Sequence, residues 1–360
     1  MAELFRCAPA PQPATDAPAP LQQQDRGVVV DIHCHVLCQR AESMALEWGV
    51  SGESGTMRFA SETSRQVAQA QRLAIRQQLT SVEARLADMD RMGVQIQVLS
   101  PAPNQYHYDA EPDVGRQLAA QVNETVAEMA QHRSRRFLGL GTVPLQHPGL
   151  AVEALRHAVK KLGLRGVEIG THVAGQDLDT LGLDAFFAEA QSLGALVFLH
   201  PAGFSEGRRL GQYFLNNVIG NPLESTVAVS RLVFSGLFER MPALKMCVAH
   251  GGGYLAAYPG RMDHAWKVRH ECRGCLQHPP SHSLKKLYFD TLVHSPQQLA
   301  QLLREYGHDR LLLGSDYPYD MGDPAARASI EALPQLDEAG RHAMLGGNAL
   351  RLLELSKHEF

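Results

Sequence analysis

The sequence predicts an α/β fold, a (β/α)8 barrel of the TIM type with insertions over the C-terminal face of its strands. Two observations predict it. Eight short apolar runs alternate with longer amphipathic stretches, as in a fold built from repeated strand–helix units. Several of these runs end in a histidine or an aspartate, and active-site residues of such barrels come from the C-terminal ends of the strands.

The expected strands are short runs of mostly apolar residues, and the expected helices show apolar positions at helical spacing. The strands are expected at residues 28–34, 94–99, 137–143, 166–171, 195–200, 245–250, 287–291 and 310–315. The helices between them include residues 115–132, 150–162, 182–193, 223–238 and 297–305. For the helix at 223–238, Asn221 offers an N-cap and Pro222 a first helical residue. Leu299, Leu302 and Leu303 form a stripe that would face the core.

Two stretches are too long for this repeat. Residues 36–80 and 203–221 are expected to lie over the mouth of the barrel, where lids and specificity residues usually occur. Residues 1–26 are rich in Pro, Ala and Gln and lack the apolar run of a secretory signal, so we expect a disordered tail. The remainder, residues 27–360, is expected to form the barrel as one domain.

Composition limits the partners and the location. A net charge of -4 gives no reason to expect nucleic acid or an anionic membrane as a partner. Charges or prolines interrupt every apolar run well short of the ~20 residues that a membrane span needs. The six cysteines are scattered along the chain, which is typical of a reducing compartment, so we expect a cytoplasmic protein.

The first expected strand ends in two histidines, His33 and His35. Side chains alternate along a strand, so both histidines would point to one side and Cys34 away from it. Later strand ends supply His200 and Asp316. Three imidazoles and a carboxylate, with one position left open, have the composition of a catalytic zinc site. We therefore expect one divalent metal ion, zinc in the first place and manganese as the alternative.

A further histidine, His250, ends the sixth expected strand and is followed by three glycines. The glycines would allow a sharp turn and a close approach of a ligand. A role as general base fits its ordinary pKa, which lies near working pH. A supporting histidine behind the ligands and a further metal ligand are the alternatives.

Two other groups of metal-binding side chains are weaker candidates. Four residues form a compact set: His270, Cys272, Cys275 and His278. Four ligands this close together are too tight for an ordinary structural zinc site, which draws on two separated pairs. Glu168 could bridge a second ion, but it precedes the end of its strand, so a single ion is expected.

The chain resembles the amidohydrolase superfamily, and within it the decarboxylase branch that includes 2-amino-3-carboxymuconate-6-semialdehyde decarboxylase. The resemblance runs from about residue 28 to the C-terminus. It rests on motifs in the family's order, namely Asp31-Ile32-His33-Cys34-His35, Gly166-Val167-Glu168-Ile169-Gly170-Thr171-His172, His200-Pro201, His250-Gly251-Gly252-Gly253, Gly260-Arg261-Met262-Asp263-His264-Ala265-Trp266, Leu313-Gly314-Ser315-Asp316-Tyr317-Pro318 and Gly347-Asn348-Ala349.

The resemblance implies roles for individual residues. It implies metal ligation by His33, His35, His200 and Asp316, and His250 as the catalytic base. Asp316, near both the metal and the substrate, could also deliver a proton. Arg261 matches an arginine that reaches across a dimer interface to a substrate carboxylate, a task that suits the planar guanidinium. A homodimer is therefore expected, and a salt bridge from Arg261 to Asp263 or to a neighbouring helix is the alternative.

The implied activity is non-oxidative decarboxylation of an unsaturated or aromatic carboxylic acid, as in the catabolism of aromatic compounds. A metal-dependent hydrolase or hydratase is the alternative, because such sites serve both chemistries. A metal-binding scaffold without activity is a third hypothesis, which the presence of His250 disfavours. The chain departs from the branch where Ala202-Gly203 replaces a tryptophan after Pro201. A second substrate arginine stays open among four candidates, Arg58, Arg65, Arg72 and Arg76.

Overall fold

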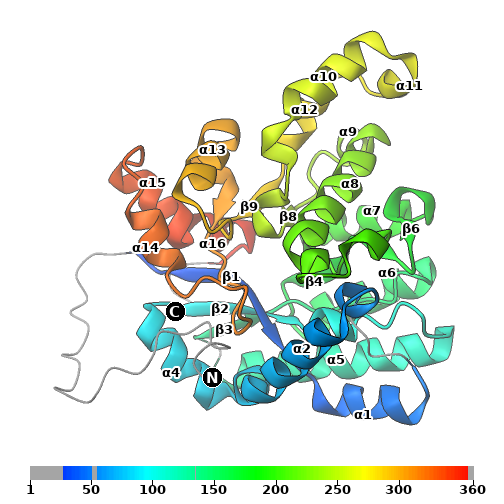
Figure 1. Cartoon of the computed structure of the whole chain (residues 1–360), viewed down its shortest axis with the longest axis vertical. Helices are drawn as coiled ribbons and strands as arrows, with labels where there is room; N and C mark the ends of the chain where they lie inside the picture. The colour runs from blue at the N-terminus through cyan, green and yellow to red at the C-terminus, as the bar shows by residue number, and fades with distance from the viewer. Residues whose placement is uncertain (1–26, 51–54, 134, 356–360) are drawn as a thin grey trace.

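Eight parallel strands form a barrel in the computed structural model, which describes residues 27–50, 55–133 and 135–355 (Figure 1). The strands are β1 (Val30–Val36), β2 (Ile96–Pro101), β3 (Phe137–Gly139), β4 (Gly166–Gly170), β7 (Leu196–His200), β8 (Met246–Val248), β9 (Tyr288–Asp290) and β10 (Leu311–Leu312). Each expected strand overlaps one of them, so the predicted fold class is confirmed. The expected tail at 1–26 lies outside the described residues.

Backbone hydrogen bonds at two seams close the barrel. Between β3 and β4, Gly141 N donates to Gly166 O at 2.9 Å and Glu168 N donates to Gly141 O at 2.8 Å. Between β1 and the chain at and after β10, Ile32 N donates to Leu313 O at 2.9 Å and His35 N donates to Tyr317 O at 2.8 Å. Closure brings the C-terminal ends of all eight strands to a single mouth.

Apolar side chains pack on both sides of the barrel wall. An inner layer fills the barrel with residues such as Val30, Ile96 and Phe198, all fully buried. The C-terminal helix α16 (Asn348–Leu352) adds Ala349 and Leu352 to this layer. The barrel is therefore a packed core with a site at one end, as expected for this fold, and not a pore.

The outer layer is formed by the helices between the strands. The predicted helices correspond to α5 (Pro112–His132), α6 (Pro148–Lys160), α7 (Asp184–Ser192), α8 (Asn221–Phe234) and α13 (Pro296–Tyr306). In α13, Leu299 and Leu302 are buried, as the stripe predicted. The helix predicted at 223–238 ends early, because Gly236 adopts a left-handed φ of 79° before the short α9 (Leu237–Arg240).

The start predicted for α8 is wrong. The π-helix η6 (Asn216–Gly220) runs directly into α8, so Asn221 has helical φ and ψ and is not an N-cap. Its side-chain Oδ1 instead accepts a hydrogen bond from Gly203 N at 2.7 Å. Glu224 likewise accepts one from Ser205 N at 2.7 Å. Both polar side chains hold the preceding loop against the helix, a contact that local sequence does not reveal.

Both predicted insertions contain short helices. The first consists of α1 (Gln39–Glu47), η2 (Gly55–Met57), α2 (Glu62–Ala74) and α3 (Arg76–Thr80), and the second of η5 (Gly207–Leu210) and η6. Asn216 in η6 joins them, because its Nδ2 lies 3.3 Å from Gly55 O and 3.2 Å from Thr56 O. A Cβ at Gly203 would lie 2.5 Å from Thr56 N, so glycine allows this close approach.

The helix α4 (Val82–Met92) precedes β2 and adds Met89 and Met92 to the outer layer. Further elements are the hairpin of β5 (His172–Val173) and β6 (Gln176–Asp177), α10 (Pro259–Val268), α11 (His270–Arg273), α12 (Pro280–Leu284), α14 (Ala326–Glu331) and α15 (Glu338–His342). Figure 1 shows α10 and α11 projecting from the barrel as an arm. Across the described part of the chain, no helix combines the length and the apolar character that a membrane crossing requires.

The close contact between β4 and β7 gives a stability prediction. A Cβ at Gly166 would lie 1.9 Å from Leu196 O, so Gly166→Ala should force the two strands apart and lower the free energy of unfolding by about 1–3 kcal/mol or more. Gly149 in α6 has no atom within 4 Å of the added Cβ, so Gly149→Ala is the matched control. It should leave stability unchanged or raise it by up to about 1 kcal/mol. Urea denaturation measures both, and equal stabilities would contradict the contact.

Candidate metal centre

A β-bulge in β1 turns both histidines of the first strand into the barrel. Asp31 and Cys34 pair with Gln97 and Leu99 of β2, so β1 has one more residue than its partner between these pairs. The Nε2 atoms of His33 and His35 lie 3.2 Å apart. The Cys34 thiol donates outward to Val98 O at 3.2 Å. The two imidazoles therefore share one side, as the sequence predicts.

The structure brings together all four predicted ligands. His200 is the last residue of β7, and Asp316 follows β10 with a left-handed φ of 58°. Asp316 Oδ1 lies 3.1 Å from His35 Nε2 and 3.4 Å from His33 Nε2. One ligand atom from each of the four residues lies within 4.8 Å of the other three, and all four residues are buried. Such a cluster can enclose one metal ion.

The imidazole of His200 tests whether a cation fits this cluster. Among the described residues, neither of its ring nitrogens has a hydrogen-bond partner, although the ring is buried. Burial, followed by the imidazoles of His35 and His33, holds the pKa of His200 well below its ordinary value. The ring is therefore neutral, with a free lone pair. A buried nitrogen without a partner costs free energy that a bound metal ion would recover.

The charges on His33 and Asp316 also fit a cation site. Burial alone would lower the pKa of His33, but the carboxylates of Asp316 and Asp290 outweigh it and raise the pKa well above its ordinary value. Burial alone would raise the pKa of Asp316, but His33, His250 and His35 outweigh it and hold the pKa well below its ordinary range. Both shifts reflect surroundings that favour positive charge between these residues, and a divalent ion would supply that charge.

His250 lies beside this cluster without belonging to it. Its Nε2 is 3.9 Å from Asp316 Oδ2, the oxygen that does not face His33 and His35. Its backbone has a φ of 55°, and three glycines with positive φ follow. A Cβ at Gly251 would lie 2.5 Å from Val293 Cγ1, and one at Gly253 would lie 2.1 Å from Pro222 O. The glycines therefore allow the tight turn that brings His250 to the mouth.

Two cavities meet at His250 and Asp316, which line both. The larger has a volume of about 430 Å³ and is also lined by His35 and His200. Both insertions contribute to it, which confirms their predicted position over the mouth. Its lining includes Arg65 and Arg72 but neither Arg58 nor Arg76, so the structure separates the four candidate arginines. The smaller cavity, of about 330 Å³, is mostly apolar, with Leu292 and Val293 in its wall.

Arg261 is not brought into the site of its own chain. It lies exposed on α10, at the base of the arm, and lines neither cavity. Among the described residues no salt bridge joins Arg261 to Asp263, whose carboxylate accepts a hydrogen bond from Ser281 N at 2.9 Å. In the part of the chain that the structure describes, the guanidinium is therefore available to a group from outside this subunit.

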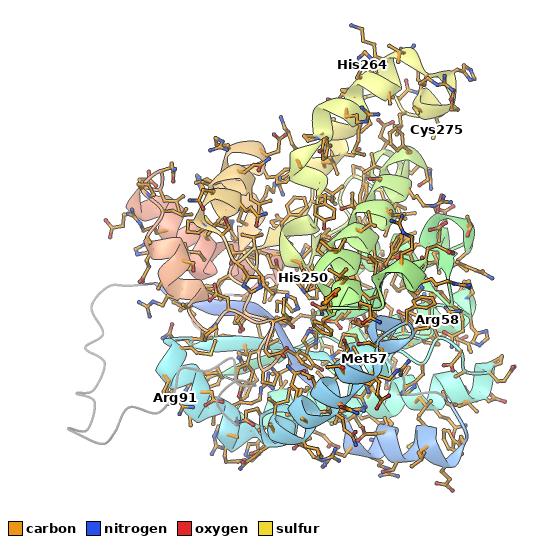
Figure 2. The ribbon with its side chains drawn as sticks, in the orientation of Figure 1. Met57, Arg58, Arg91, His250, His264 and Cys275 are labelled. Carbon is orange, nitrogen blue, oxygen red and sulfur yellow. The ribbon has the colours of Figure 1, made fainter. Side chains whose placement is uncertain are left out.

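The compact His/Cys set and Glu168 do not form metal sites among the described residues. Figure 2 shows Cys275 on the arm, far from His250. His278 Nδ1 instead faces Glu239 Oε1 at 3.3 Å. The Glu168 Oε1 atom accepts the Tyr106 hydroxyl at 2.5 Å, and Oε2 lies 3.9 Å from His35 Nδ1. Since His35 Nε2 faces the other ligands, Glu168 lies behind the ligand ring.

Sequence reasoning missed the residues that support the ligands. Asp31 accepts the Ser315 hydroxyl at 2.6 Å, and Arg85 donates to His35 O at 2.7 Å while its guanidinium lies 4.8 Å from the centre of the Tyr317 ring. Asp290 lies 2.6 Å from His33 Nδ1. A signal existed for Asp290, because it lies one residue before the end of the strand expected at 287–291. No local pattern pointed to Arg85.

Comparison with known proteins places this geometry in a family. A family profile described as "Amidohydrolase" matches residues 30–355. The chain belongs to the amidohydrolase family. The 2-amino-3-carboxymuconate-6-semialdehyde decarboxylase of Dictyostelium discoideum is 32% identical to it over 337 residues, which cover 93% of this chain and 94% of that one.

Two solved structures show the same fold. The 5-carboxyvanillate decarboxylase of Sphingomonas paucimobilis superposes with a TM-score of 0.81 at 24% identity, over 91% of this chain and 99% of that one. The dihydroxybenzoic acid decarboxylase of a Polaromonas species, solved with bound manganese and an inhibitor, gives a TM-score of 0.76 at 24% identity. That match covers 93% of this amidohydrolase and 99% of the Polaromonas chain.

The ligand cluster gives a prediction on metal content. The wild-type protein should contain about one divalent ion per chain, and His200→Ala should weaken binding by more than about 100-fold, because even residues that only support a ligand contribute 10–100-fold. Metal analysis after dialysis measures the content. His172→Ala is the matched control, since His172 is partly buried but lies outside the cluster. Equal metal content in all three proteins would contradict the site.

Proposed function

We propose that this amidohydrolase is a metal-dependent, non-oxidative decarboxylase, a carboxy-lyase that acts on an unsaturated or aromatic carboxylic acid. The observation that carries the proposal is the cluster of four ligand side chains at the barrel mouth, three of which line one cavity together with His250. The similarity to a named decarboxylase over nearly the full length of both chains supports it.

His33, His35, His200 and Asp316 would hold one divalent ion. Imidazole and carboxylate donors suit zinc, and we propose zinc as the resident ion. Manganese is the alternative, which the ion bound to the Polaromonas structure supports. When bound, the ion would polarise a substrate oxygen or lower the pKa of a water molecule.

The remaining chemistry needs a proton and no oxidant. In decarboxylation the bond between the substrate carbon and its carboxylate breaks, carbon dioxide leaves, and the electron pair stays on the carbon, which then takes up a proton. Asp316 Oδ1 faces His33 and His35, whereas Oδ2 lies 3.9 Å from His250 Nε2. This arrangement would let His250 act as the base and Asp316 pass a proton toward the substrate.

Arginine side chains would hold a carboxylate of the substrate. Arg72 lines the large cavity and pairs with Glu42 at 3.2 Å, an exposed contact of little energy that a substrate carboxylate could replace. We further propose a homodimer in which Arg261 enters the site of the partner subunit. The exposed position of Arg261, outside both cavities of its own chain, supports this role.

We also propose a cytoplasmic location. The five cysteines within the described residues are all free thiols, which is expected in a reducing compartment. Three of them, Cys34, Cys38 and Cys247, are buried. No charge pattern favours nucleic acid or a membrane as a partner, so a small carboxylic acid remains the proposed ligand.

Release of carbon dioxide is the direct test of the activity. We expect the metal-loaded protein to release it from at least one member of a panel of muconate semialdehydes, hydroxybenzoates and carboxyvanillates. His250→Asn should lower kcat by about 10²–10⁴-fold, because it removes the proposed base. His172→Ala is the control that should retain activity. Product formation without carbon dioxide would favour the hydrolase or hydratase, and no turnover of the panel would contradict the proposal.

Mixed subunits test the proposed role of Arg261. Arg261→Ala and His250→Ala proteins should each be inactive alone. In a mixed dimer, one site would combine an intact His250 with the partner's intact Arg261, so random exchange should restore about a quarter of the wild-type activity. Mass spectrometry of differently tagged subunits confirms the exchange. No recovery in a mixture with confirmed exchange would contradict the role across the interface.

A further inference from the structure

One carboxylate, that of Asp290, contacts two different parts of the candidate site. Asp290 is the last residue of β9 and is fully buried. Its Oδ2 lies 2.6 Å from His33 Nδ1 and accepts from His250 N at 2.9 Å. Its Oδ1 accepts from Gly251 N at 2.7 Å and from Leu292 N at 3.2 Å. Four donors thus converge on the two oxygens of a fully buried carboxylate.

The contact with His33 fixes the tautomer of the imidazole. A carboxylate is only an acceptor, so the hydrogen bond requires the proton of a neutral His33 ring to lie on Nδ1. The lone pair is then on Nε2, the nitrogen that faces His35 and Asp316. Asp290 therefore presents His33 to the ligand cluster in the form that a metal ion requires.

The contacts with the loop after β8 fix the backbone of His250. His250 and Gly251 have φ values of 55° and 61°, in the left-handed region that a histidine rarely adopts. Such a conformation costs free energy and persists only where surrounding contacts impose it. The Asp290 carboxylate accepts from the N–H groups of both residues. It therefore holds the turn that places the imidazole of His250 beside Asp316.

We propose that Asp290 is a positioning residue that sets the metal ligand His33 and the base His250 at the same time. One carboxylate at the end of a barrel strand contacts both residues. It would therefore set the position of the proposed base His250 relative to the proposed ligand His33. This inference rests on the proposed roles of His33 and His250 and assigns to Asp290 the geometry that joins them.

Asp290→Asn tests the proposal, because an amide has the same shape but only one acceptor oxygen. If the amide nitrogen faces His33, it clashes with the proton on Nδ1 and opposes metal binding at Nε2. If it faces Gly251, the N–H group of Gly251 in the turn that carries His250 loses its acceptor. We expect Zn²⁺ affinity, measured by competition with a chromogenic chelator, to fall by about 10–100-fold. At saturating Zn²⁺, kcat should fall at least tenfold, with KM changed less than threefold.

Asp88→Asn is the matched control. Asp88 is also a buried carboxylate and accepts the Tyr317 hydroxyl at 2.6 Å, but it contacts neither His33 nor His250. Its variant should keep Zn²⁺ affinity and kcat within about twofold of wild type. If both variants lose affinity and melting temperature equally, Asp290 serves the fold alone and the proposal is wrong. Wild-type affinity and kcat in Asp290→Asn would also overturn it.

A measurement on the wild-type protein covers the case in which Asp290→Asn does not fold. In protein labelled with ¹⁵N-histidine and loaded with Zn²⁺, NMR should show His33 protonated at Nδ1 and coordinated through Nε2. Coordination through Nδ1 would refute the proposal. If the wild type binds Zn²⁺ and releases carbon dioxide while Asp290→Asn behaves normally, only this inference fails. If the wild type does neither, the proposed function fails instead.

Discussion

The candidate site depends on the seam between β1 and the chain at and after β10, one of the two seams that close the barrel. β1 meets the chain at and after β10 through backbone hydrogen bonds, including Asp316 N to His33 O at 2.8 Å. This seam joins residues almost 300 positions apart and places the histidine pair against the aspartate. Asp31 reinforces it through Ser315, and Arg85 through the ring of Tyr317. Because the barrel is closed, the three histidine ligands lie on strands, and the fourth ligand, Asp316, is hydrogen-bonded to one of these strands.

The sequence predicted the site residues that lie at the C-terminal ends of expected strands. His33, His35, His200 and Asp316 each follow an apolar run, and closure of a parallel barrel is sufficient to bring them together. Other features depend on partners that are distant in the chain. The bulge in β1 exists only relative to β2. Asn221 looked like an N-cap because its contact with Gly203 is invisible to local patterns.

The substrate end of the cavity is built by the two insertions. Small residues at Ala202 and Gly203 let the turn Gly55–Met57 approach the loop after β7, and Asn216 bonds to that turn. Thr56 and Met57 then line the cavity. The wall of the cavity beside Ala202 is therefore built by a segment distant in the chain. Because the contacts that place these insertions join segments distant in the chain, local sequence could not single out one of the four candidate arginines.

The inner apolar layer of the barrel determines from which side small molecules can reach the ligand cluster. The ring of Phe198 lies 5.1 Å from that of His33, centre to centre, directly beneath the ligand cluster. Below it, the barrel is packed with aliphatic side chains to the C-terminal helix. Apolar side chains thus close the inner end of the site. Ligands and solvent would therefore reach the cluster from the mouth, where His250 lines both cavities.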